Sequence, residues 1–194
     1  VVAAERGRDP ASLPAQTSWT FAEWGLSDED FLDLHRKGVL EHRMFLHMPV
    51  IPGVADALWR LSDAGVWIRL ITHRLYANWG HATAVADTVA WLDRNGVPYR
   101  DLCFLGNKPQ VEADAYVDDA PHNVLSLREQ GATVVVFDQP YNAELEGPRA
   151  TSWPEVEALV VDLVVARGRP VQEQMRGFAD PVTRLRTKQP GEGA

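Results

Sequence analysis

The sequence predicts an α/β fold, a largely parallel sheet covered by helices on both faces with a small helical insert near the N-terminus. Helical patterns alternate with short, β-branched apolar runs between residues 54 and 137. Gly or Asn-Gly follows the helical patterns, at 65, 95–96 and 131. Such alternation implies parallel strands joined by right-handed crossovers. In these sheets ligands bind beyond the carboxyl ends of the strands.

The first helix–strand unit begins at Pro52-Gly53. Apolar residues at helical spacing predict a helix over Val54–Ala64, and the β-branched-rich run Val66–Ile71 predicts a strand that ends at Thr72. The same pattern then repeats along the chain. It predicts helices over 82–94, 121–130 and 154–166, and strands over 102–105, 115–117 and 133–137.

Two regions depart from this alternation. Residues 9–50 lack strand signals, and Ser27 is a good N-cap for a helix over 27–40 with an acidic first turn. We therefore expect a small helical cap at 9–50 and a core built from 1–8 and 51–166. The polar segment 167–194 is expected to be a tail that is partly disordered from residue 177 onward.

Composition narrows the class of protein. The 194 residues are 45% hydrophobic and 24% charged, which suits one compact domain. The net charge is −8, whereas proteins that bind a nucleic acid polymer carry an excess of Lys and Arg, so we do not expect such a partner. The longest apolar stretch, 156–166, is interrupted by acids and too short to span a membrane, and the charged first residues do not indicate secretion. We therefore expect a cytoplasmic protein. We expect the side chain of its single cysteine, Cys103, to be buried as a small apolar group.

Polar residues at the ends of the predicted strands are the candidate site. Thr72 ends one strand, Lys108 follows the next, and Asp118 and Asp119 follow the third. A hydroxyl donor, a cation and paired carboxylates that suit Mg²⁺ are what phosphoryl transfer needs. No P-loop and no Gly-x-Gly-x-x-Gly motif is present. Each residue alone also fits a structural role, as a strand-end hydroxyl, a solvated loop lysine, or a turn before a helix.

The order Thr, Lys, Asp-Asp resembles motifs two to four of the haloacid-dehalogenase superfamily. The local sequence around these residues resembles the 5'(3')-deoxyribonucleotidase-like branch, the 5' nucleotidase, deoxy (pyrimidine), cytosolic type C proteins. The resemblance covers about residues 1–142 and is carried by Ile71-Thr72-His73-Arg74-Leu75, His81-Ala82-Thr83, Trp91-Leu92-Asp93 and Tyr116-Val117-Asp118-Asp119-Ala120-Pro121.

This resemblance implies a Rossmann-like three-layer α/β/α sheet and a Mg²⁺-dependent phosphomonoesterase that acts on deoxynucleoside monophosphates through an aspartyl-phosphate. The implied catalytic residues are Thr72 and Lys108, and the implied metal ligands are Asp118 and Asp119. The implied substrate contacts are Thr72, Lys108, His73, Arg74 and, for the base, the cap aromatics Trp19 and Phe21, with Trp24 as a further candidate. Aromatic residues in a small cap also fit a role in the cap's own core.

Members of the superfamily begin with a central apolar strand that ends in Asp-x-Asp, the nucleophile and the general acid and base. The 194 residues contain no such strand before the cap. We therefore expect an N-terminally shortened form of an enzyme, without turnover, whose sheet has two inner edges with unpaired backbone groups.

The same residues are also compatible with two other functions. One is a non-catalytic module that binds phosphate or nucleotides, and the other is a phosphatase acting on another small phosphorylated metabolite. Base and sugar preference, 5' versus 3' phosphate and oligomeric state also stay open, with a homodimer as one alternative.

Overall fold

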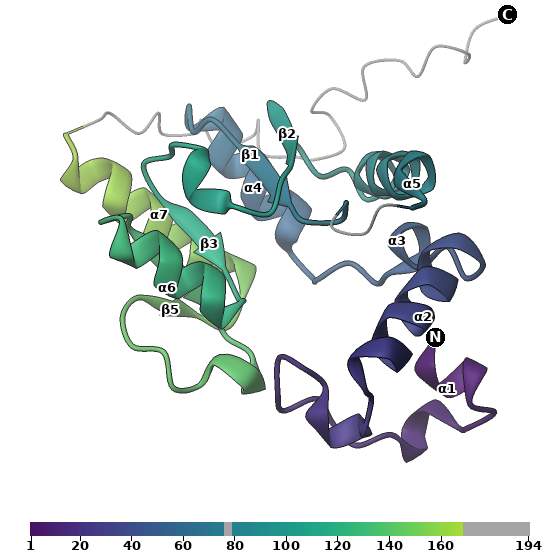
Figure 1. The fold of residues 1–194 in the computed structure, drawn as a ribbon. Coiled ribbons are helices and arrows are strands. Elements are labelled where there is room, and N and C mark those ends of the chain that lie inside the picture. Colours follow the sequence, from purple (N-terminus) through teal and green to yellow (C-terminus); the bar gives the residue numbers. More distant parts are fainter. Residues whose placement is uncertain (76–78, 169–194) are drawn as a thin grey trace, which may run out of the picture.

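The structure, a computed structural model, describes residues 1–75 and 79–168 (Figure 1). The segment 177–194, for which we expected disorder, lies outside the described residues. In the described part of the chain, no helix has the length and apolar character needed to cross a membrane.

Helices and strands alternate along the core as the sequence predicts, which confirms the α/β fold with parallel strands. The elements are α4 Val54–Asp63, β1 Arg69–Thr72, α5 His81–Arg94, β2 Asp101–Phe104, β3 Tyr116–Asp118, α6 Pro121–Glu129, β4 Val134–Phe137, β5 Arg149–Ala150 and α7 Trp153–Ala166. β1 starts later than expected because the Val66 N–H bonds the Leu61 carbonyl (2.9 Å) and closes α4 instead. The two-residue strand β5 was not predicted.

Strand β4 shows how the helices cover both faces of the sheet. Val135 and Phe137 pack into the apolar cluster that includes α4 and α7. Val134 and Val136, which point the other way, pack on α6. All four side chains are buried, so β4 is the middle layer of a helix–sheet–helix arrangement.

The strands form two separate groups. β1 pairs in parallel with β2, and β3, β4 and β5 form a second parallel sheet in that order. Among the described residues, β1 and β3 have no ladder between them. A cavity of about 790 Å³ lies there instead, lined by residues 66–71, by 112–118 and by apolar side chains of α4 and α7. We call this cavity the central slot. It agrees with the expectation of two inner strand edges without partners.

The cap consists of short helices. These are α1 Val2–Glu5, α2 Asp28–Leu40, α3 Met44–His47 and the 3₁₀ turns Pro10–Ser12 and Ala22–Trp24. The expected N-cap of α2 is present as a capping box, because Ser27 Oγ accepts from the Asp30 N–H (3.1 Å) and Asp30 accepts from the Ser27 N–H (3.3 Å).

Residues 1–8 pack on the cap rather than on the sheet. Glu5 forms ion pairs with Lys37 of α2 (3.1 Å) and His42 (2.8 Å). This differs from the expected placement of 1–8 in the core. The reason is that Glu5 of α1 has its charged partners in the cap, at Lys37 of α2 and at His42 just after α2.

An ion pair joins the cap to the core. Arg43 Nε donates to Asp87 Oδ2 of α5 (2.7 Å), and Asp87 is 2% exposed. A buried carboxylate needs such a cationic partner, so this contact fixes the position of α3 on α5.

Candidate active site

Asp118 is the last residue of β3, and its side chain is almost fully buried. Its Oδ2 atom forms an ion pair with Lys108 Nζ, and the exposed fractions of the two side chains are 3% and 18%. Its Oδ1 atom accepts from the Ala120 N–H (3.0 Å) and from Asn123 Nδ2 (3.2 Å). Lys108 begins a 3₁₀ turn after β2, so two of the predicted strand-end residues meet here.

The neighbouring Asp119 is held by the turn that follows β4, the 3₁₀ turn Pro140–Asn142. Tyr141 Oη donates to Asp119 Oδ2, and Asn142 Nδ2 donates to the Asp119 backbone carbonyl (2.8 Å). Burial and the bond to Asp119 both raise the pKa of the Tyr141 phenol, so it remains a hydrogen-bond donor.

The cap aromatics divide into two groups. Trp19 lies edge-on against Tyr141 (5.4 Å between ring centroids) and against His122 (5.1 Å), beside Asp119. Phe21 instead packs on Trp24 (4.8 Å) and on Phe31 of α2 (5.8 Å), inside the cap. Trp19 therefore contacts the tyrosine that bonds Asp119, and Phe21 and Trp24 have the structural role named above.

The last residue of β1 and the residue after it contact β2 and the segment that follows it. Thr72 pairs with Phe104 of β2, and its carbonyl accepts from the Leu105 N–H (3.0 Å). The His73 imidazole lies over Gly106, where an added Cβ would come within 2.6 Å of Nε2. Any side chain at 106 would therefore displace this ring.

Arg74 turns toward the cap. Its guanidinium lies 4.4 Å from the centre of the Phe45 ring and donates to Thr88 Oγ1 (2.9 Å). Burial lowers the pKa of this guanidinium. These contacts draw Arg74 to α3 and α5, whereas the predicted phosphate site is at the end of β3.

The central slot opens onto the ion pair. Both Lys108 and Asp118 contribute to its lining, together with the apolar side chains described above. A segment that occupied the slot would therefore lie beside Lys108 and Asp118.

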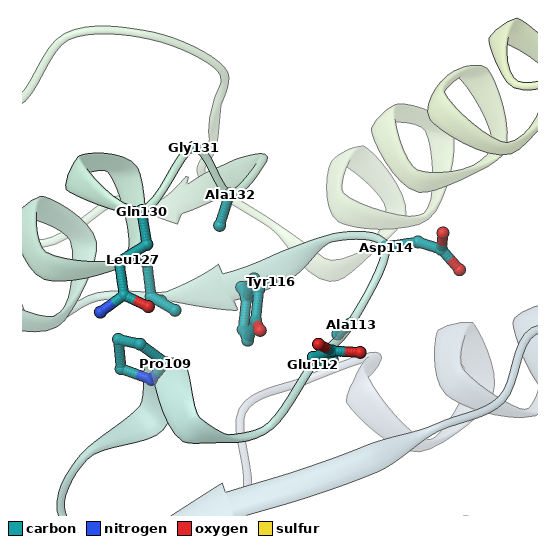
Figure 2. A pocket seen from close by; sticks show the side chains of 9 residues that line it. All are labelled: Pro109, Glu112, Ala113, Asp114, Tyr116, Leu127, Gln130, Gly131 and Ala132. Carbon is teal, nitrogen blue, oxygen red and sulfur yellow. The ribbon is translucent and has the colours of Figure 1, made fainter.

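A second cavity, of about 550 Å³, lies at the opposite end of β3 (Figure 2). Its lining includes Glu112, Asp114 and Tyr116 but, among the described residues that form it, no Lys or Arg. Asp114 is already paired with Arg167 (2.6 Å). An acidic lining disfavours a phosphate ester, so the end of β3 at Asp118 is the better candidate site.

Asp118 and Asp119 are the residues that the sequence predicts as Mg²⁺ ligands. This ion prefers oxygen ligands and typically takes one or two carboxylates plus substrate phosphate and water. Asp118 and Asp119 supply such oxygens. In residues 1–75 and 79–168, no group of three or more His, Cys, Asp or Glu side chains is arranged to hold a metal. The two carboxylates can therefore supply only part of a Mg²⁺ coordination shell, which further oxygens must complete.

Several residues near the two carboxylates are not predicted as site residues by the sequence. The sequence patterns assign no role to Tyr141, Asn142, His122 or Asn123. The rule that polar residues after a strand end belong to the site could have found Tyr141 and Asn142, because they follow β4 by four and five residues. His122 and Asn123 lie in the first turn of α6, where no sequence signal separates them from ordinary helix surface.

Proteins with similar sequences show which family the chain belongs to. A model of the 5' nucleotidase, deoxy (pyrimidine), cytosolic type C protein family matches residues 2–168. A protein of Chlorobaculum tepidum named "Putative 5'(3')-deoxyribonucleotidase" is 45% identical over 149 residues, which cover 76% of this chain and 74% of that protein. An Oceanobacillus iheyensis protein named "Putative nucleotidase" is 30% identical over 114 residues, which cover 53% of this chain and 56% of that protein.

Proposed function

Because the chain belongs to the 5' nucleotidase, deoxy (pyrimidine), cytosolic type C family, within the haloacid-dehalogenase-like superfamily, we propose that it acts on deoxynucleoside monophosphates with Mg²⁺ as cofactor. Membership makes it a nucleotidase, and hence a phosphatase among the hydrolases. The observation that carries the finer proposal is the ion pair of Lys108 with Asp118, next to Asp119 and at the end of the central slot.

The proposed roles follow from the charge of the phosphate group. Lys108 lies within reach of one carboxylate and attracts the phosphate oxygens by its positive charge. Thr72 donates its hydroxyl to a phosphate oxygen. Asp118 and Asp119 would hold Mg²⁺, which when bound supplies further positive charge to the phosphoryl oxygens. Trp19, whose ring contacts Tyr141, would stack on the base.

The nucleophile is proposed to come from a strand in the central slot. An apolar strand fits the apolar lining from α4 and α7, and pairing with β1 and β3 would satisfy the backbone groups of both inner edges. Acids at the end of that strand would lie near Lys108, which suits an Asp-x-Asp segment. Its first aspartate would attack phosphorus and form an aspartyl-phosphate.

The test is phosphate release from deoxynucleoside monophosphates and from sugar phosphates, with and without Mg²⁺. Two proteins are compared, the 194-residue chain and the same chain preceded by an apolar strand that ends in Asp-x-Asp. We expect Mg²⁺-dependent release from deoxynucleotides by the extended chain and none by the 194-residue chain. An extended chain with Asn at both acid positions is the matched control and should be inactive.

Three outcomes would contradict the proposal. Equal turnover by the 194-residue chain would rule out the added aspartate as nucleophile. Turnover that does not depend on Mg²⁺ would remove the metal role of Asp118 and Asp119. A preference for sugar phosphates would place the substrate in another class of small phosphorylated metabolites.

A further inference from the structure

Two consecutive residues after β4 hold Asp119. Tyr141 Oη donates to one oxygen of the Asp119 carboxylate, and Asn142 Nδ2 donates to the Asp119 carbonyl (2.8 Å). The side chain and the backbone of Asp119 are thus both fixed from the same turn. This arrangement restricts the rotation of the carboxylate about its side-chain bonds.

The turn is itself rigid because the amide of Asn142 is fully used. Asn142 is 1% exposed, and its Nδ2 also donates to the Phe137 carbonyl (2.8 Å). Its Oδ1 accepts from the Gln139 N–H (3.1 Å) and from Arg149 Nη1 (2.8 Å). Arg149 Nη2 donates to the Asn142 carbonyl as well (2.9 Å). A buried amide with all its partners in place keeps one orientation.

The cap reaches the same tyrosine. Trp19 lies edge-on to the Tyr141 ring at an interplanar angle of 71°, and edge-on to the His122 ring at 61°. The Tyr141 phenol is therefore located between Asp119 in the core and Trp19 in the cap. A shift of the cap that moves Trp19 would change the packing of the ring whose hydroxyl orients Asp119.

We infer that Tyr141 is a positioning residue that sets the orientation of the Asp119 carboxylate and couples it to the cap through Trp19. This inference rests on the proposed role of Asp119 as a Mg²⁺ ligand. The physical reason is that a ligating carboxylate binds metal best when a hydrogen bond to one oxygen fixes its plane, and loss of such a partner typically costs 10–100-fold in metal affinity.

The test is binding of Mn²⁺, used as a paramagnetic probe for the Mg²⁺ site, measured by electron paramagnetic resonance on the full 194-residue chain. Tyr141→Phe keeps the ring and its contact with Trp19 but removes the donor to Asp119. We expect about tenfold weaker binding. Tyr116→Phe is the matched control, because Tyr116 donates to the Val111 carbonyl at the far end of β3 and its loss should leave the affinity unchanged.

Coupling to the cap is measured with Trp19→Ala in both backgrounds. We expect weaker Mn²⁺ binding when Tyr141 is present and no further loss in Tyr141→Phe, because Trp19 acts through the phenol. Additive losses would overturn the coupling, and wild-type affinity in Tyr141→Phe would overturn the positioning role while leaving the metal site intact. Failure of the unchanged chain to bind Mn²⁺ would contradict the proposed metal site and this inference with it. Circular dichroism spectra that match the unchanged chain establish that the variants are folded.

Discussion

Each oxygen of the buried Asp118 carboxylate has its own partner, and Lys108 is the charged one. Lys108→Met would leave a carboxylate that is 3% exposed with neutral donors alone, so the free energy of unfolding should fall by about 3 kcal/mol. Urea unfolding at neutral pH measures this loss. The double variant Lys108→Met with Asp118→Asn removes both charges and should regain part of it. If the losses of stability of Lys108→Met and Asp118→Asn simply add in the double variant, the buried charge is not the cause.

At the scale of elements, the loop that carries Trp19 depends on one carboxylate. Glu23 accepts from the Ser18 hydroxyl and from the backbone N–H groups of Thr17 and Ser18, and these bonds lower the pKa of Glu23 to about 2. A carboxyl whose pKa is lower in the folded state contributes stability above its unfolded pKa of 4.5, and this contribution is lost as the pH falls from 4.5 toward 2. Glu23→Gln should therefore destabilise this loop at pH 7 and have little effect near pH 2. Limited proteolysis between residues 13 and 24 at both pH values measures the difference, and an equal effect at both would contradict the assignment.

At the scale of the whole molecule, the divided sheet is the main feature. Within residues 1–75 and 79–168, β1 and β3 each have a partner strand on one side only. Their amides that face the central slot should therefore exchange with solvent faster than the amides of β4, which lies between two strands. Hydrogen exchange followed by mass spectrometry measures this. In the chain extended by an apolar strand, exchange in β1 and β3 should slow toward that of β4, because the slot is then filled. Unchanged exchange in the extended chain would mean that the added strand does not occupy the slot.

Sequence reasoning succeeded where the signal is local. Gly65, Asn95-Gly96 and Gly131 end helices because these residues tolerate backbone conformations that close a helix, so the helix boundaries could be read directly. The proximity of Lys108 and Asp118 could also be predicted, because both lie at the carboxyl ends of parallel strands. The expectation of open inner edges came from the absence of a strand pattern before the cap.

The α/β alternation, the helical segment at 27–40 and the charged residues at the strand ends can be predicted from the sequence, because they depend on periodicity and on neighbours a few residues apart. The contacts of Arg74 with Phe45, of Phe21 inside the cap, and of Trp19 with Tyr141 beside Asp119 depend on how distant segments pack. Trp19 and Tyr141 are 122 residues apart, and no local pattern encodes which aromatic ring of the cap faces the core. That choice follows from how the cap and the sheet pack on each other.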